Sequence, residues 1–585
     1  MRYLKLLANG IWGGLYGATL IAALVLIVNR EELAQASSPA ASFVLVAGLV
    51  SVYGPLICLA LATAFVFVRF FAARKLGIGW FSLKAIVWFG VAALGAVTSV
   101  YSRNLGALGS LLSPGQRGTL RSAVVIMIVC CLAALTAAVL GQLRPGEAGD
   151  PLRRLAAAIL AAPVPVVLLL TLAWSPASGL DRGAAPPGAL APAGPGGSLL
   201  SAPPDLLMIG VETASMDLIL PLVSAGELPT LERLLKEGAS ARLNSIRPCD
   251  PLVAWTVLAT GAPPWRNGIR DASTYRLFGA PADLGVLPRG IGLHRLLALG
   301  FGSARGRQER AQGPATLLEL LSTLGFETVS VEWPYPTGEA LPPIETTRAR
   351  ALAPNLERLL GSTAHAGLAQ HERLSKIVRQ CVARDLSAKE AAEAALRRAG
   401  PPGPRAVAVR LSGLGLVSAY FLRYQMPAEF GDVAAQEQAA LGGVLAEYYK
   451  FVDGLVADLI SASSRPSVIL VESAYGVEPA PAIGRLARRL MPGGRGRQLI
   501  EPSGSWSNGP DGVLLIHGPG VAPGSKVEEA DILDGFPTTL YALGIPIERG
   551  LPGSLLRRLF ERRYLETHPV VFVPAYAERR GGPSR

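Results

Sequence analysis

Cysteine and charge are both scarce in this 585-residue chain. It contains 5 cysteines, and 17% of its residues are charged, against 50% that are hydrophobic. Cys58, Cys130 and Cys131 fall in apolar runs, so only Cys249 and Cys381 are left for a disulfide, and their spacing does not show whether they pair. The framework of a disulfide-rich small domain is thereby excluded. The mean hydropathy of +0.38 is high for a soluble protein.

The sequence also lacks any run of Lys and Arg interleaved with aromatic residues. The formal net charge is +12, but it comes from scattered arginines, several of which border apolar runs. Basic residues that bind nucleic acid gather in a patch or stripe, so we expect no nucleic-acid partner. A basic domain beside a membrane could attract anionic lipid headgroups. An arginine-rich composition without a specific partner explains the charge more simply.

Long apolar runs are present, and they all lie in the first 174 residues. Five runs come near the roughly 20 residues that a membrane-spanning helix needs, at 11–28, 43–70, 83–101, 123–143 and 155–174. They show no amphipathic face, which predicts an all-α membrane domain of about five transmembrane helices over residues 1–174. The second run is long enough to tilt, or to bend at Gly54-Pro55.

Basic residues are divided unequally between the two sides of these spans. One side carries Arg2, Lys5, Arg69, Arg74, Lys75, Lys84, Arg144, Arg153 and Arg154, and the other carries Arg30, Arg103, Arg117 and Arg121. The richer side is expected to face the cytoplasm, which places the N-terminus there. Five crossings then place the C-terminal half in the periplasm or outside the cell.

The rest of the chain divides into a linker and an α/β domain. Residues 175–204 hold 7 Pro, 6 Gly, 7 Ala and 4 Ser, a composition typical of a tether. Over residues 205–585, short apolar strands alternate with helices, which predicts an α/β sandwich with a parallel sheet. Strands are expected at 206–211, 328–333, 406–411, 468–471 and 513–516, and helices at 228–237, 315–324, 436–461 and 532–543. The stretches 275–312 and 336–400 interrupt this rhythm and are expected to form a cap or insertions.

Short segments of the α/β region form an ordered set. They are Leu207–Glu212, Gly226–Leu231, Ala254–Gly261, Asn267–Asp271, Val329–Pro334, Gly413–Tyr424, Val471–Val477, Pro510–Gly520 and Ile532–Leu540. In order and spacing this set resembles the type I phosphodiesterase / nucleotide pyrophosphatase family of the alkaline-phosphatase superfamily. The resemblance covers almost all of 205–560. It implies an alkaline-phosphatase-like αβα sandwich with cap insertions, and a two-metal site that activates a hydroxyl nucleophile.

The resemblance also implies which positions hold the metal ligands. They are occupied here by Glu212, Gly415, Ala419, Ala474, Tyr475 and Asn508. Only Glu212 keeps a carboxylate, and Asn508 keeps a weak amide oxygen. Zinc needs three or four good donors, so this set is too poor for a metal cage. The five histidines, at 294, 365, 371, 517 and 568, fall on none of these positions, and His517 is expected to end a strand.

The nucleophile position is changed as well. The family's Thr or Ser is replaced by Pro251, which has no nucleophilic atom. The neighbouring Asp250 could attack phosphorus only if the loop shifted by one residue. Thr256 and Thr260 are the nearby hydroxyls, and we expect them to form hydrogen bonds at a helix start.

These changes favour a pseudoenzyme that is anchored in the membrane and faces outward. It is expected to bind a ligand or to act as a scaffold, without a cofactor, on a lipid bilayer and with an envelope protein, anionic lipid or glycan as partner. The alternative is an active metal-dependent phosphodiesterase or phosphatase, or an envelope phosphoglycerol or phosphoethanolamine transferase, with an atypical site. That alternative requires zinc or manganese.

Overall fold

The structure is a computed structural model that describes residues 2–35, 39–71, 83–143, 203–306, 313–334, 339–340, 367–369, 371–398, 403–463, 467–480 and 502–574, with isolated positions between 155 and 167 and at 465 and 576. The chain divides into two compact units. One comprises Met1–Arg182 with Ile269–Gln308, and the other comprises Gly183–Gly268 with Glu309–Arg585.

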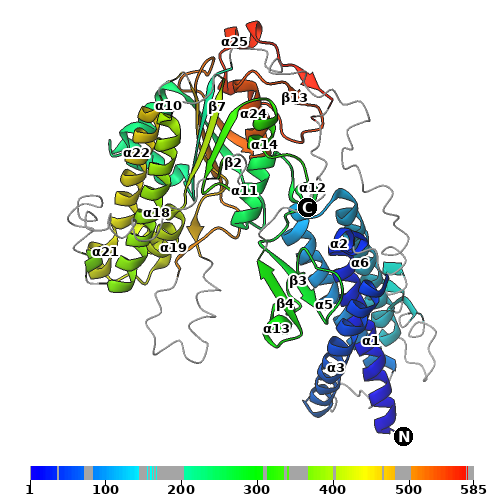
Figure 1. Cartoon of the computed structure of the whole chain (residues 1–585). Coiled ribbons are helices and arrows are strands. Elements are labelled where there is room, and N and C mark those ends of the chain that lie inside the picture. Colours follow the sequence, from blue (N-terminus) through cyan, green and yellow to red (C-terminus); the bar gives the residue numbers. More distant parts are fainter. Residues whose placement is uncertain are drawn as a thin grey trace. The chain divides into compact units, whose positions relative to one another are not determined.

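The first unit is built on long apolar helices, drawn in blue and cyan in Figure 1. Its elements are α1 (Arg2–Val28), α2 (Arg30–Gln35), α3 (Pro39–Phe71), α5 (Leu83–Leu108), η1 (Gly109–Leu111), α6 (Pro114–Leu143), β3 (Ser273–Leu277), α13 (Leu293–Ala298) and β4 (Gly302–Gly306). Three helical segments are long and apolar enough to cross a membrane: Gly10–Val28, Ala40–Ala64 and Pro114–Leu140. These segments support membrane anchoring. The expected count of five spans is not confirmed, since the run at 155–174 lies largely outside the described residues.

The helices α1 and α3 run antiparallel and approach closely at glycines. A Cβ added to Gly10 would lie 2.9 Å from the Sγ of Cys58, and one added to Gly14 would collide with the carbonyl of Gly54. Small residues allow helix backbones to pack closely in a membrane. The helix α3 continues through Pro55, so the second apolar run forms one long helix.

Residues Ile269–Gln308 pack with the helices of this first unit. The strands β3 and β4 pair antiparallel, and α13 lies between them in the sequence. Their apolar side chains share one buried cluster with the helices. Its members are Ala18, Ala22, Val25, Leu33, Ala41, Leu45, Leu49 and Tyr53 from the helices, and Tyr275, Leu277, Ala280, Ala282, Leu284, Leu287, Leu293 and Leu296 from the later segment. Most of the stretch 275–312, one of the two that were expected to form a cap or insertions, is therefore part of the helical unit.

The second unit is an α/β domain. Its first elements are β1 (Asp205–Val211), α9 (Met216–Ser224), α10 (Pro229–Glu237), β2 (Ala239–Asn244), α11 (Pro251–Thr260), α12 (Pro264–Asn267), α14 (Leu317–Thr323), β5 (Glu327–Val331), β6 (Glu339–Ala340), α18 (Glu372–Arg397), β7 (Arg405–Leu411), α19 (Gly413–Gln425), α20 (Pro427–Phe430), α21 (Ala435–Leu441) and α22 (Val444–Ala462). They are followed by β8 (Ser467–Ser473), β9 (Glu478–Pro479), β10 (Gly504–Ser505), β11 (Gly512–His517), β12 (Lys526–Asp531), η5 (Ile532–Asp534), α24 (Gly535–Ala542), β13 (Ile547–Glu548), η6 (Arg557–Leu559), α25 (Arg562–Thr567) and β14 (Phe572–Val573).

The main sheet has eight strands in the order β12-β2-β11-β8-β1-β7-β5-β6. The central β1 pairs parallel with β7 and β8, and β5 pairs parallel with β7. The strand β11 is antiparallel to both β8 and β2. The sheet is therefore mixed, and the expectation of a parallel sheet is wrong for β11. A buried apolar run identifies a strand but does not give its direction.

Helices cover both faces of this sheet, which makes an αβα sandwich. Leu207, Ile209 and Val211 of β1 share a buried cluster with residues of α10, α18, α19 and α22. On the other face, a Cβ on Gly210 would lie 2.8 Å from Trp255 of α11 and 2.9 Å from Trp333. Figure 1 shows α10, α18, α19 and α22 on one side of the sheet, and α11, α14 and α24 on the other.

Most predicted elements are present with shifted ends. The helix expected at 436–461 is divided into α21 and α22 at Gly442 and Gly443, because glycine destabilises a helix interior. The helix expected at 532–543 begins with the short η5 before α24. His517 is the last residue of β11, as expected for a residue at a strand end.

Candidate functional site

The candidate site lies where three neighbouring parallel strands end. Glu212 follows β1, Tyr475 comes shortly after β8, and Arg410 is the next-to-last residue of β7. The N–H of Glu212 donates to the carbonyl of Leu411 at 3.0 Å, which holds the end of β1 beside β7. Carboxyl ends of parallel strands meet at one edge of a sheet, where α/β proteins commonly bind ligands.

Glu212 is the centre of a buried polar cluster. Its Oε1 accepts hydrogen bonds from the hydroxyl of Tyr475 and, at 3.2 Å, from the indole Nε1 of Trp255. Its Oε2 lies 3.6 Å from Nη1 of Arg410. The guanidinium of Arg410 also lies over the Trp255 ring, 5.8 Å from the centroid. Glu212 is 8% exposed, so its charge is compensated mainly by protein groups.

Tyr475 acts here as a hydrogen-bond donor. Burial and the negative charge of Glu212 together raise the pKa of its hydroxyl well above the usual range. The phenol therefore keeps its proton and can donate to Glu212 at any physiological pH. A histidine nitrogen at this position could ligate a metal. The protonated phenol instead donates a hydrogen bond to Glu212, the carboxylate at another implied ligand position.

Gly415 leaves the space that Glu212 fills. A Cβ on Gly415 would lie 2.6 Å from Cγ of Glu212, closer than real Cβ contacts come. Any side chain at 415 therefore requires Glu212 to move. Positions 212 and 415 are both implied ligand positions. The side chain of Glu212 fills the space that a side chain at 415 would need, so the two positions together supply one carboxylate.

The helix α19 that carries Gly415 is fixed by a carboxylate from α18. Both oxygens of Asp385 accept from the N–H of Gly413, at 3.0 and 3.2 Å, and the hydroxyl of Tyr448 donates to Asp385 at 2.9 Å. Burial raises the pKa of Asp385 to about 6, although these hydrogen bonds act against that rise. This contact satisfies an N–H group at the start of α19, which has no capping side chain of its own.

Ala419 and Ala474 occupy two further ligand positions and offer only methyl groups. Both side chains are buried, at 3% and 0% exposure. The backbone carbonyl of Ala419 is already used, because it accepts from the N–H of Ser503 at 2.6 Å and from its hydroxyl at 3.1 Å. Neither alanine supplies a donor to a metal.

The nucleophile region forms an ordinary helix start. Pro251 is the first residue of α11, and Oδ1 of Asp250 accepts from the N–H groups of Leu252 at 3.0 Å and Val253 at 3.3 Å. Asp250 is thereby the N-cap of α11, a role in which aspartate stabilises a helix. In this geometry its Oδ1 is aimed at the helix rather than at an incoming phosphate.

The two threonines bond within the helix. The hydroxyl of Thr256 donates to the carbonyl of Leu252 at 2.6 Å, and that of Thr260 donates to the carbonyl of Thr256 at 2.7 Å. Both therefore make the structural hydrogen bonds that were expected, but in the middle and at the end of α11 rather than at its start.

Asn508 lies in an exposed turn. The preceding Ser507 accepts from the N–H of Cys249 at 3.2 Å, which places this turn beside the loop that leads to Asp250. Cys249 and Cys381 are both buried and free, and burial raises the pKa of each thiol to about 12.

A metal fits these residues poorly. Within the described ranges, no three His, Cys, Asp or Glu side chains gather as a metal cluster. At the six implied positions, the buried carboxylate is already engaged by Tyr475, Trp255 and Arg410. The arginine supplies the positive charge that a metal would otherwise bring to Glu212.

Arg410 is the site residue that the sequence analysis missed. The resemblance gives no role to its position, and a strand-end arginine looks like an ordinary surface residue. One signal was available, since Arg410 falls inside the apolar run 406–411 that was expected to form a buried strand. A charge at the end of a buried strand is unusual unless it is paired.

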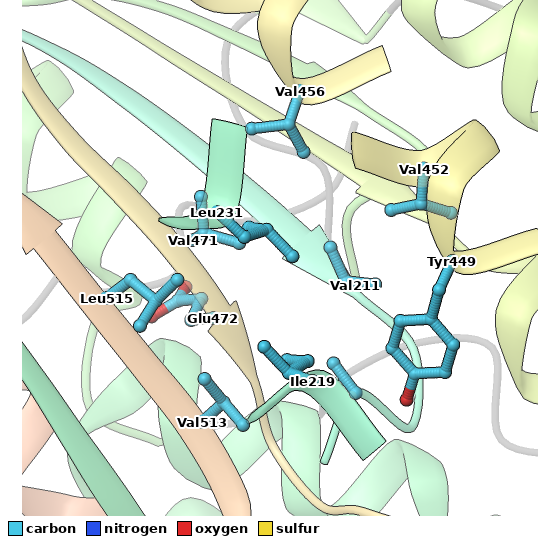
Figure 2. A pocket seen from close by; sticks show the side chains of 11 residues that line it. Val211, Ile219, Leu231, Tyr449, Val452, Val456, Val471, Glu472, Val513 and Leu515 are labelled. Atoms are coloured by element: carbon cyan, nitrogen blue, oxygen red, sulfur yellow. The ribbon is translucent and has the colours of Figure 1, made fainter. Parts of the chain in front are cut away.

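A cavity on the opposite face of these strands from Trp255 is too small for a ligand. It measures about 10 Å³, at most the room of one water molecule. Figure 2 shows Glu472 of β8 among apolar side chains such as Val471, Val513 and Leu515. Burial raises the pKa of Glu472 to about 8, and its Oε1 has no hydrogen-bond partner in the described part of the chain. Glu472 is therefore mainly a neutral acid at neutral pH.

Comparison with solved structures finds distant similarities only. Murine ectonucleotide pyrophosphatase / phosphodiesterase 5 is similar over 61% of this chain and 100% of its own, at 10% identity and a TM-score of 0.34. Phosphonate monoester hydrolase from Silicibacter pomeroyi covers 61% of this chain and 76% of its own, at 13% identity and a TM-score of 0.33. A mutant of alkaline phosphatase PafA covers 62% and 100%, at 12% identity and a TM-score of 0.39. No curated protein sequence matches the chain.

The sequence itself gives the family. Residues 206–490 match the type I phosphodiesterase / nucleotide pyrophosphatase family. This match begins at β1 and includes the segments around Glu212, Pro251, Gly415 and Tyr475. The resemblance found in the sequence is thereby confirmed as a match of residues 206–490, about half of the chain, to the type I phosphodiesterase / nucleotide pyrophosphatase family.

Proposed function

We propose that this protein is a membrane-anchored, outward-facing pseudoenzyme that binds a ligand or scaffolds an envelope assembly. One observation carries the proposal: Glu212 is held by Tyr475, Trp255 and Arg410, and its Cγ fills the place of any side chain at 415. The residues at the implied ligand positions thus bond and pack with one another, and this arrangement includes no metal. Two-metal hydrolysis needs ions to polarise the phosphate and to activate the nucleophile.

The first test measures bound metal in the full-length protein. The protein is purified in detergent after growth with zinc and manganese, and its metal content is determined by mass spectrometry. We expect well below one equivalent of either metal. A variant with the family's ligand types restored (Glu212→Asp, Gly415→Asp, Ala419→His, Ala474→Asp, Tyr475→His, Asn508→His) is the positive control for metal detection.

The second test measures hydrolysis of an activated aryl phosphodiester. We expect the background rate, unchanged by Glu212→Ala. Stoichiometric metal together with turnover that Glu212→Ala or Asp250→Ala abolishes would contradict the proposal and support the alternative, an active phosphodiesterase, phosphatase or envelope transferase. Turnover that survives chelation would contradict both.

The partner follows from the proposed location. The expected orientation puts the α/β unit in the periplasm or outside the cell, where envelope proteins, anionic lipids and glycans are available. A reporter that is active only in the cytoplasm, fused after Arg585, should stay silent. An active reporter would reverse the orientation and exclude these partners.

A further inference from the structure

Two asparagines of the first unit, Asn29 directly after α1 and Asn104 in α5, hold one loop of the later segment Ile269–Gln308, here called the docking segment. Nδ2 of Asn29 donates to the carbonyl of Val286 at 2.9 Å, and Oδ1 accepts from the N–H of Val286 at 3.0 Å. Asn104 of α5 bonds Arg289 in the same way, at 2.9 and 2.7 Å. Each amide thus matches both backbone groups of one residue, and both asparagines are fully buried.

A buried arginine of the docking segment completes the end of α1. Nη1 of Arg270 donates to the carbonyl of Val28 at 2.8 Å, and Nη2 forms an ion pair with Glu32. Nε2 of Gln116 donates to the same carbonyl at 3.1 Å. Arg270 is 2% exposed. The last carbonyls of a helix have no partner within the helix, so these donors satisfy a group that a membrane border would otherwise leave unpaired.

The docking segment also covers part of the N-terminal half of α3, which has 33 residues. Phe278 packs so closely on Gly48 that a Cβ there would collide with its ring, and the hydroxyl of Tyr53 donates to the carbonyl of Ile291 at 2.6 Å. Protein rather than lipid therefore covers this side of α3 around Gly48 and Tyr53.

All these contacts lie at one end of the helical unit. They involve the C-terminal ends of α1 and α5, the N-terminal half of α3 and the N-terminal end of α6. From these observations we infer that the docking segment is a second, non-covalent membrane anchor. It keeps the C-terminal fragment bound to the helices of the first unit even when the linker at 175–204 is cut. This inference does not depend on whether the site binds a metal.

The test cuts the linker in the full-length protein. A specific protease site is placed within 183–204, and the protein carries a tag after Arg585. After complete cleavage in mild detergent, capture through the tag should recover the helical fragment together with the C-terminal fragment. Recovery of the C-terminal fragment alone would overturn the inference.

The double variant Asn29→Asp with Asn104→Asp shows whether the docking segment is the anchor. It keeps the shape of each side chain but turns a donor into an acceptor that faces a carbonyl oxygen. We expect the helical fragment to be lost on capture. Asn244→Asp, at an exposed end of β2, is the matched control and should retain it. Retention by the double variant equal to that of the control would overturn the inference.

A second pair of variants tests the helix-end contact. Arg270→Ala should release the helical fragment, while Arg276→Ala should not, because Arg276 is 41% exposed and pairs with Asp283 inside the docking segment. If a variant fails to accumulate, crosslinking decides. Oxidation of Asn29→Cys with Val286→Cys should join the two fragments after cleavage, and each single cysteine variant controls for the native thiols. Failure of the pair to crosslink would count against the inference.

Discussion

Asp385 and Glu212 are two buried carboxylates that touch the same helix, α19, and they are satisfied in different ways. Asp385 accepts the N–H of Gly413 at the start of α19 and a hydrogen bond from Tyr448. Glu212 packs against Gly415 one turn later and accepts from the side chains of other elements. The first carboxylate orders the backbone that carries the site. The second fills a position that the resemblance assigns to a metal ligand, and its partners are side chains rather than backbone groups.

The largest effect is expected from removing the framework carboxylate. Asp385→Ala leaves the N–H of Gly413 and the Tyr448 hydroxyl without their acceptor, so we expect the second unit to lose about 3 kcal/mol of stability. Thermal unfolding of the full chain in detergent measures the loss. Asp458→Ala, at a side chain that is 55% exposed, is the control. A loss no larger than that of the control would mean that Asp385 does not hold α19.

A third buried carboxyl, Glu472, sharpens the comparison because its Oε1 has no described partner. Its folded pKa of about 8 lies above the ordinary value of 4.5, so the folded state favours the protonated acid. Stability is then full below about pH 4.5 and falls as the pH rises through about 8. Urea unfolding of the full chain across this window should show the fall.

Glu472→Gln should flatten this pH profile, because a neutral amide has no proton to lose. In this variant the loss of stability between about pH 4 and about 6 should persist. The pKa of Asp385 is also raised in the folded state, so its ionisation lowers stability as the pH rises in the same way. An unchanged profile in Glu472→Gln would show that another group causes the pH dependence.

A smaller effect tests whether Glu212 and Gly415 exclude each other. Gly415→Ala should destabilise the second unit by about 1–3 kcal/mol, because its Cβ meets Cγ of Glu212. Glu212→Ala removes that atom, so the double variant should lose clearly less than the sum of the two single losses. Thermal unfolding of all four proteins gives the coupling. Simple additivity would mean that the two positions are independent.

The smallest effect concerns the hydroxyl nearest the nucleophile position. Thr256→Val removes the hydrogen bond to Leu252 and should cost about 1 kcal/mol of stability, with no change in phosphodiester hydrolysis above background. The unfolding midpoint and the hydrolysis rate are measured on the same sample. Hydrolysis above background in the parent protein that Thr256→Val abolishes would assign Thr256 to chemistry and remove the contrast between framework and site.

The sequence predicts the parts of this fold that depend on local pattern. The strand ending at Val211 and the helix beginning at Pro229 are found because burial imposes a period on the apolar residues. Direction is not local, so the antiparallel β11 was missed. Partners distant in sequence were missed as well: the start of α10 is capped by Asp453 of α22, which accepts from the N–H groups of Thr230 and Leu231 at 3.1 and 2.8 Å.

The sequence predicted which residues form the candidate site better than it predicted how their side chains contact one another. The resemblance pointed to Glu212, Gly415 and Tyr475, and the structure brings these three together. It could not show that the phenol donates to the carboxylate or that Arg410 stands beside it, because both depend on side-chain packing. The docking segment was read as an insertion for a similar reason: its apolar residues face helices more than 200 positions earlier, as the 257 residues between Asn29 and Val286 show.

The asparagine contacts have a consequence for the biogenesis of the protein. Because synthesis runs from the N-terminus, α1 exists before Val286 is made, 257 residues later, and α5 exists before Arg289, 185 residues later. At ribosomal speeds the first delay is roughly 10–50 s. During that time Oδ1 of Asn29 does not yet have its donor, the N–H of Val286. The end of the helical unit that Asn29 and Asn104 share is therefore completed late, and a nascent chain that stops before residue 269 presents an unfinished membrane protein to the cell's quality control.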